Sequence, residues 1–123
     1  MKNNEEEEIV AEAVKYFRNS DKKKRLNCAQ SVLKAFQKRY DIPDDFIDSY
    51  AEYGYGKSPE GYCGAFYAAK YFFEKKNISS KVLENHFMKY AGSVLCKEIR
   101  KNRKLSCLKC VEEATRVVIN HLT

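Results

Sequence analysis

The chain has no tryptophan and only two prolines and five glycines among its 123 residues, and it lacks a long apolar run. No stretch approaches the roughly 18 consecutive apolar residues that a membrane-spanning helix needs, so we expect no transmembrane segment. Residues 1–8 are acidic and contain no apolar signal region. We therefore do not expect a secreted protein, and the cytoplasm is the expected location. Nine Tyr and seven Phe supply the core volume that tryptophan does not.

Several motifs are also missing. No apolar alternation of useful length occurs, which predicts the absence of a sheet. The chain has no phosphate-binding Gly-Lys-Ser/Thr loop, no dinucleotide fingerprint after a strand and no G-x-S-x-G. The covalent haem motif C-x-x-C-H fails because Val111 occupies the histidine position. Ordinary nucleotide-dependent and hydrolytic enzyme classes therefore find little support.

Helical periodicity dominates what remains. It predicts an all-α, single-domain bundle of five to six helices over residues 1–123, with a glycine-rich loop before the central helix. Asn27 is the expected N-cap of the second helix, with Gln30 completing a capping box. Gly92 is expected to interrupt the helical stretch that begins near Ser80 and continues to Ile99.

The stretch 54–64 holds four of the five glycines and Pro59, which is typical of a loop with unusual backbone angles. Directly after it, apolar and mostly small residues recur at helical spacing, at Ala65, Ala68, Ala69 and Phe72. Such a face lets another backbone come close. We expect residues 54–61 to fold over a cysteine cluster, with Gly61 and Gly64 as accessory positions.

The five cysteines are the candidates for chemistry. Cys28, Cys63 and Cys107 fall at predicted helix starts, where free N–H groups and the helix dipole favour a thiolate, so we expect lowered pKa values there. Cys107 and Cys110 form a C-x-x-C pair, and Cys96 has cationic neighbours. A cysteine in an apolar stripe is commonly a small buried hydrophobe, and for Cys110 packing and function are equally supported.

The formal net charge is +6, with basic runs at 22–25 and 97–104. A solvated surface is the favoured interpretation of both runs, and nucleic-acid binding is not favoured. One alternative is a basic helical interaction module in which the cysteines merely pack, with Lys97, Arg100 and Arg103 carrying partner binding. His86 and His121 are isolated and are interpreted as surface or satisfied core residues rather than metal ligands.

The cysteine segments, taken in order, resemble a known family. They are Asn27-Cys28-Ala29-Gln30-Ser31-Val32, then Gly61-Tyr-Cys63-Gly64-Ala65, then Cys96, then Cys107-Leu-Lys-Cys110-Val111. This order resembles the C-GCAxxG-C-C family of redox-active proteins over about residues 26–122. The resemblance makes Cys28, Cys63, Cys96 and Cys107 the family's four cysteines and Cys110 an extra one, and Ala68 stands where the family motif has glycine.

The resemblance implies a small α-helical protein with a redox or metal role, often linked to transporter genes. The family is also similar to a split-Soret cytochrome domain, so binding of a cofactor stays an alternative. The expected partner is a redox protein that the sequence does not identify, and a homodimer is left open.

Our leading hypothesis is thiol–disulfide redox activity, which would make the protein an oxidoreductase. In it Cys63 is the attacking thiolate and Cys28 the resolving partner, while Cys107 and Cys96 form a second pair. The alternative is a zinc or iron–sulfur site built from the same four cysteines.

Overall fold

The computed structural model describes the backbone of residues 2–19, 25–54 and 56–122, and side chains from residue 5 onward within these ranges. Lys22 to Lys24 of the first basic run lie outside the described residues. The described chain is all-α, as predicted. Its helices are α1 (Lys2–Arg18), α2 (Cys28–Ala35), α3 (Gln37–Tyr40), α4 (Asp44–Asp48), α5 (Gly64–Lys75), α6 (Lys81–Tyr90), α7 (Cys96–Asn102) and α8 (Cys107–Leu122), with a 3₁₀ turn at Pro59–Gly61.

This count exceeds the five to six helices expected because α3, α4 and α7 are each only four to seven residues long. The backbone turns at Phe36 and separates α3 from α2. The described residues include no helix with the length and apolar character needed to cross a membrane.

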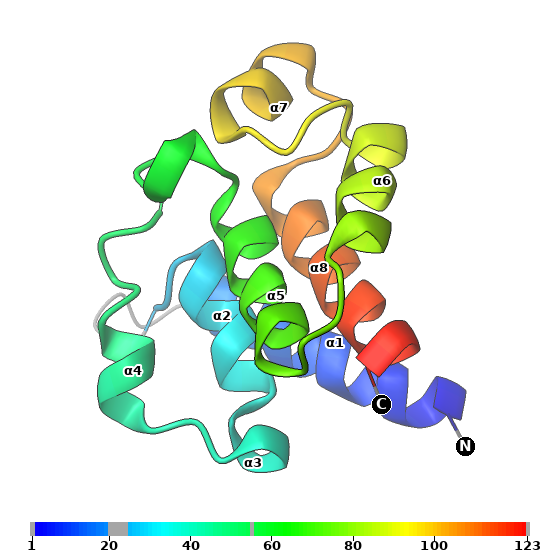
Figure 1. The fold of residues 1–123 in the computed structure, drawn as a ribbon. Helices are drawn as coiled ribbons and strands as arrows, with labels where there is room; N and C mark the ends of the chain where they lie inside the picture. Colours follow the sequence, from blue (N-terminus) through cyan, green and yellow to red (C-terminus); the bar gives the residue numbers. More distant parts are fainter. Residues whose placement is uncertain (1, 20–24, 55, 123) are drawn as a thin grey trace.

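The core is formed where α5 packs against α2 and α8, with α1 lying across α2 and α8 (Figure 1). The predicted small face of α5 is the reason for this close packing, since Ala65, Ala68 and Ala69 are completely buried. Ala68, which stands in place of the family's glycine, thus fits with its methyl group enclosed. Aromatic side chains fill the remaining volume, among them the fully buried Phe36, Phe66, Phe72, Phe73 and Phe87.

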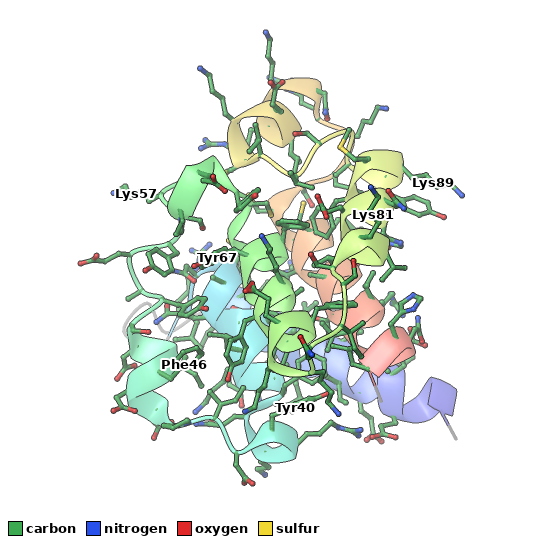
Figure 2. All side chains as sticks on the ribbon, in the orientation of Figure 1. Tyr40, Phe46, Lys57, Tyr67, Lys81 and Lys89 are labelled. Atoms are coloured by element: carbon green, nitrogen blue, oxygen red, sulfur yellow. The ribbon has the colours of Figure 1, made fainter. Side chains whose placement is uncertain are left out.

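A second group of aromatic residues lies where α3, α4 and α5 meet, on the side of the molecule that carries Tyr40, Phe46 and Tyr67 in Figure 2. Tyr50 packs its ring 5.2 Å from that of Phe46 and 5.7 Å from that of Tyr67, measured between centroids. These contacts attach the segment after α4 to the outer face of α5. The glycine-rich loop therefore starts from a fixed point.

The segments before α5 and before α7 lie side by side. Tyr62 and Leu95 form an isolated antiparallel bridge, and the Cys63 N–H donates a 2.8 Å hydrogen bond to the Val94 carbonyl. Gly92, with φ of +80°, separates α6 from α7, so the predicted interruption is confirmed. Consequently α7 is placed at the end of the bundle where α5 and α8 begin (Figure 1).

Candidate functional site: a cavity among helix starts

Every one of the four cysteines singled out lies at the beginning of a helix. Cys28, Cys96 and Cys107 are the first residues of α2, α7 and α8, and Cys63 is the N-cap of α5. This was predicted for Cys28, Cys63 and Cys107. It was not predicted for Cys96, which was expected inside a continuing helix and instead starts a helix of its own.

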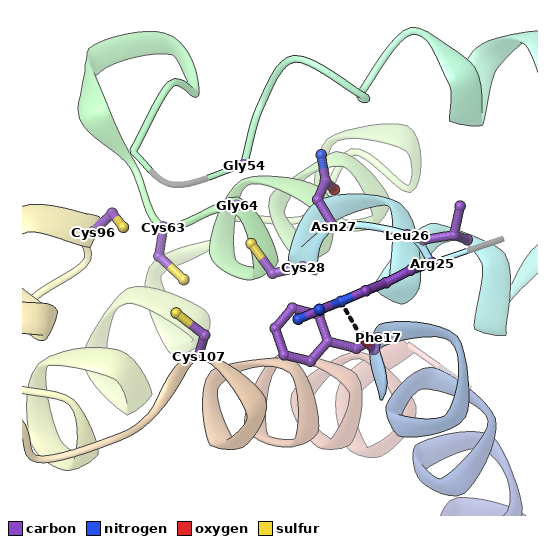
Figure 3. Close-up of a pocket in the computed structure, with 10 residues that line it drawn as sticks. All are labelled: Phe17, Arg25, Leu26, Asn27, Cys28, Gly54, Cys63, Gly64, Cys96 and Cys107. Carbon is purple, nitrogen blue, oxygen red and sulfur yellow. Dashed lines mark hydrogen bonds between the residues drawn. The ribbon is translucent and has the colours of Figure 1, made fainter. Parts of the chain in front are cut away.

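These four cysteines surround one small cavity, shown in Figure 3. Its volume is about 30 Å³, which is room for one or two water molecules. The wall is completed by Phe17, Arg25, Leu26, Asn27, Gly54 and Gly64. The structure therefore brings together the four thiols that lie far apart in the chain.

The capping residue of α2 also fixes the loop above the cavity. The Asn27 side chain accepts a 2.8 Å hydrogen bond from the Gln30 N–H, and the Gln30 side chain accepts one from the Asn27 N–H, so the predicted capping box is present. In addition, Asn27 Nδ2 donates to the carbonyls of Tyr50 and Ala51 at 2.9 and 3.0 Å. One side chain thus caps α2 and holds the segment that leads into the glycine loop.

Glycine is required where α2 and α5 meet. A Cβ atom on Gly64 would lie 2.5 Å from Cys28 Sγ and 2.9 Å from the Tyr53 carbonyl oxygen. Gly56, with φ of +83°, lies over Cys96, since its Cβ would come within 3.7 Å of that sulfur. The predicted loop therefore lies over Cys96, and its Gly54 lines the cavity. Gly61 differs, because its φ of +77° demands glycine although nothing lies within 4 Å of a Cβ there.

The thiols influence one another electrostatically. Cys63 is the strongest thiol neighbour of Cys28, and Cys96 is the strongest thiol neighbour of Cys107. The charge of a Cys63 thiolate also raises the pKa of Cys96 and the pKa of Cys107. Cys63 thus acts on each of the other three thiols, and the two pairs proposed from the sequence, Cys28 with Cys63 and Cys96 with Cys107, stay predictions.

The expected low pKa values are wrong for the reduced protein. Burial raises the pKa of Cys28 to about 12, and it also raises the pKa of Cys96 and Cys107. The pKa of Cys63 is raised well above its ordinary value, first by a hydrogen bond with Cys110 and then by burial. With a pKa near 12, about one Cys28 thiol in 100,000 is ionised at pH 7.

The helix-start effect exists, but it is the smaller one. The backbone N–H of Ala65, in the first turn of α5, donates to the sulfurs of both Cys28 and Cys63 and lowers their pKa values. Phe66 donates a second N–H to Cys63. Removal from water outweighs these hydrogen bonds because the thiolate loses its hydration in a nearly closed cavity.

Arg100 is a cation that acts on two thiols of the cluster. It forms a hydrogen bond with the Cys96 thiol and lowers the pKa of that group, and its charge also lowers the pKa of Cys107. Neither effect cancels the rise caused by burial. Cys96 and Cys107 nevertheless have Arg100 as a cationic partner. No cation contributes to the raised pKa values of Cys28 and Cys63.

A scan against family models matches residues 26–121 to the family described as "Putative redox-active protein (C_GCAxxG_C_C)". The chain belongs to this C-GCAxxG-C-C family. No curated protein and no solved structure matches the chain. The recognition made from the ordered cysteines is confirmed, and the match covers α2 to α8.

The position of Cys110, the cysteine that is additional to the family's four, could not be predicted from the sequence. It is 1% exposed on α8, one turn after Cys107, and its thiol pairs by hydrogen bonding with Cys63 rather than with the sulfur of its own C-x-x-C motif. The C-x-x-C spacing drew attention to Cys107 instead. No local signal in the sequence could have identified Cys63 as the partner of Cys110, because their contact depends on how α5 packs on α8.

All five cysteines of this C-GCAxxG-C-C protein are free thiols. Over residues 2–19, 25–54 and 56–122, no group of three or more His, Cys, Asp or Glu side chains is arranged so that it could hold a metal ion. The residues thus do not fit a preformed zinc or iron–sulfur site, although four of them line one cavity. His86 is bound at 2.7 Å to Glu113, which agrees with its interpretation as a satisfied residue.

Proposed function

We propose that this protein is a thiol–disulfide redox protein in which the clustered cysteines act in pairs. The observation that supports this most is the cavity itself, where sulfurs from the starts of α2, α5, α7 and α8 meet. Members of a C-GCAxxG-C-C family described as redox-active are expected to use these cysteines.

The chemistry follows the usual course of thiol–disulfide exchange. One thiol loses its proton and attacks a sulfur of an acceptor disulfide, RSSR, which releases RS⁻ and leaves a mixed disulfide. A second protein thiolate attacks the mixed disulfide, releases the other RS⁻ and closes an internal disulfide. The two protons end on two RSH molecules, and the two electrons have reduced RSSR.

Cys96 and Cys107 are the pair that reacts first in this proposal. Cys96 is the strongest thiol neighbour of Cys107, and Arg100 favours ionisation of both. Cys28 and Cys63 form the inner pair, whose raised pKa values keep them protonated until the outer pair is oxidised. Cys63 then attacks within the cluster rather than as the first nucleophile, which revises the role expected from the sequence.

The test is to oxidise the reduced full-length protein with the neutral thiol oxidant diamide at low protein concentration and to count and map the remaining thiols. We expect two thiols to be lost first, with Cys96 joined to Cys107, and the loss to be blocked in Cys96→Ser. Cys110→Ser is the matched control and should form the same first disulfide. Unchanged thiol counts, or disulfides between molecules only, would overturn the proposal.

The metal alternative is tested on the same preparation by elemental analysis, with thiols counted before and after chelation. A dithiol protein should contain no stoichiometric metal, and its thiol count should not change on chelation. Stoichiometric zinc or iron, with thiols that become countable only after chelation, would replace our proposal by the metal site.

A further inference from the structure

Cys96 lies between two hollows of the molecule. On its inner side it lines the cavity shared with the other three cysteines. On its outer side it lines a separate groove, open to solvent, with Gly56, Lys97 and Arg100. The groove has a volume of about 360 Å³, within the range of sites that take small molecules. Among the four cysteines around the inner cavity, Cys96 is the one that also lines this groove.

The groove is cationic. Lys97 and Arg100 are exposed, and its lining residues include no carboxylate. In the part of the chain that the structure describes, none of the ion pairs involves either residue. Arg100 directs a hydrogen bond to the Cys96 thiol, and its planar guanidinium retains further donors that suit a carboxylate. A negatively charged ligand would therefore be held directly beside the sulfur.

Resting on the function proposed above, we propose that this groove binds small disulfides that carry carboxylates, and that Cys96 is the thiol that exchanges with them. The size of the groove suits such a molecule better than a protein chain, and its two cations favour an anionic one over a neutral or cationic one. The inner cavity has room for only one or two water molecules, so the ligand itself stays outside.

The reaction divides between the two hollows. In the groove, Cys96 thiolate attacks one sulfur of the bound disulfide, forms a mixed disulfide and expels the first anionic thiolate. From the cavity side, Cys107 attacks the Cys96 sulfur, breaks the mixed disulfide and expels the second thiolate. Each expelled thiolate takes up one of the two protons that the protein thiols have lost, so the ligand leaves as two thiols.

The experiment compares two disulfide probes of opposite charge, glutathione disulfide and cystamine. Each is mixed with reduced full-length protein, and the rate of mixed-disulfide formation at Cys96 is followed by peptide mass mapping after acid quenching. The readout is the ratio of the two rates, because changes in the intrinsic reactivity of Cys96 cancel in that ratio. Neutral 2-hydroxyethyl disulfide serves as the reference.

The groove variant is Lys97→Gln/Arg100→Gln. The matched control is Lys101→Gln/Arg103→Gln, which removes the same two charge types from exposed positions that do not line the groove. We expect the wild type to favour glutathione disulfide over cystamine, the groove variant to lose about tenfold of that preference, and the control to keep it within about twofold.

Equal ratios in the wild type and the groove variant, or an equal loss in the control, would overturn the groove while leaving thiol–disulfide exchange intact. Mixed disulfides that map to another cysteine would also overturn it. If even the neutral disulfide leaves all the protein thiols unreacted, the proposed function fails, and the groove assignment fails with it.

Discussion

Gly64→Ala is expected to separate α2 from α5 at the point where Cys28 and Cys63 meet. The added Cβ would lie 2.5 Å from Cys28 Sγ, 2.9 Å from the Tyr53 carbonyl oxygen and 3.3 Å from the Ala29 Cβ. The carbonyl and the Cβ are not the ends of flexible side chains, so α5 must move. Overpacking of this kind costs about 1–3 kcal/mol, against up to about 1 kcal/mol gained from the better helix propensity of alanine.

We therefore expect Gly64→Ala to lower the free energy of unfolding by about 1–2 kcal/mol, measured by urea denaturation of the reduced protein. Combining it with Cys28→Ala removes the closest contact, so the penalty should shrink by at least about 0.5 kcal/mol in that background. Gly61→Ala is the control, because its cost arises from a φ of +77° and no neighbour is near. Its penalty should not change with Cys28→Ala. A Gly64→Ala protein as stable as the wild type, or a cycle without coupling, would refute the packing argument.

Three further predictions follow from the site. Asn27→Asp should keep the cap of α2 but lose the two hydrogen bonds donated to the loop, while Asn27→Ala should lose the cap as well as those hydrogen bonds. Urea denaturation should show a loss of about 1 kcal/mol or more for each variant, and a variant as stable as the wild type would refute this. The rate of Cys28 alkylation should increase about tenfold per pH unit beyond pH 9 and level off only near the Cys28 pKa of about 12. Because this pKa lies above the unfolded value of 9.0, the stability that the buried thiol contributes is present below pH 9 and is lost as the pH rises towards 12. A plateau near pH 9 in the folded protein would contradict it. Cys110→Ala should lower the pKa of Cys63 and speed its alkylation severalfold, with a smaller effect for Cys110→Ser, which keeps a hydrogen-bond partner; equal rates in all three proteins would show that the thiol pair does not control Cys63.

Local signals in the sequence were enough to predict much of the frame. The capping box of Asn27 and Gln30 placed the start of α2 correctly, because it depends on residues three apart. The glycines before Cys63 and the small face at Ala65 and Ala69 indicated a close approach of helices, which the structure shows. Such features are written in short windows of sequence, where side-chain size and hydrogen bonding act locally.

Features that depend on packing were not predictable. The sequence indicated the helix N-termini that favour thiolates but not the burial that outweighs them at Cys28 and Cys63. It gave no sign that Cys110 on α8 would meet Cys63, or that the Cys63 N–H would donate a hydrogen bond to the Val94 carbonyl. Each of these is a contact between helices whose relative position only the whole core determines.

Disulfide mapping of the mildly oxidised monomer tests the central claim most directly, namely that thiols of separate helices are gathered around one cavity. We predict internal disulfides that join separate helices, Cys96 of α7 to Cys107 of α8 and Cys28 of α2 to Cys63 at the start of α5. A protein that formed only the local Cys107–Cys110 disulfide, or only disulfides between molecules, would contradict the account.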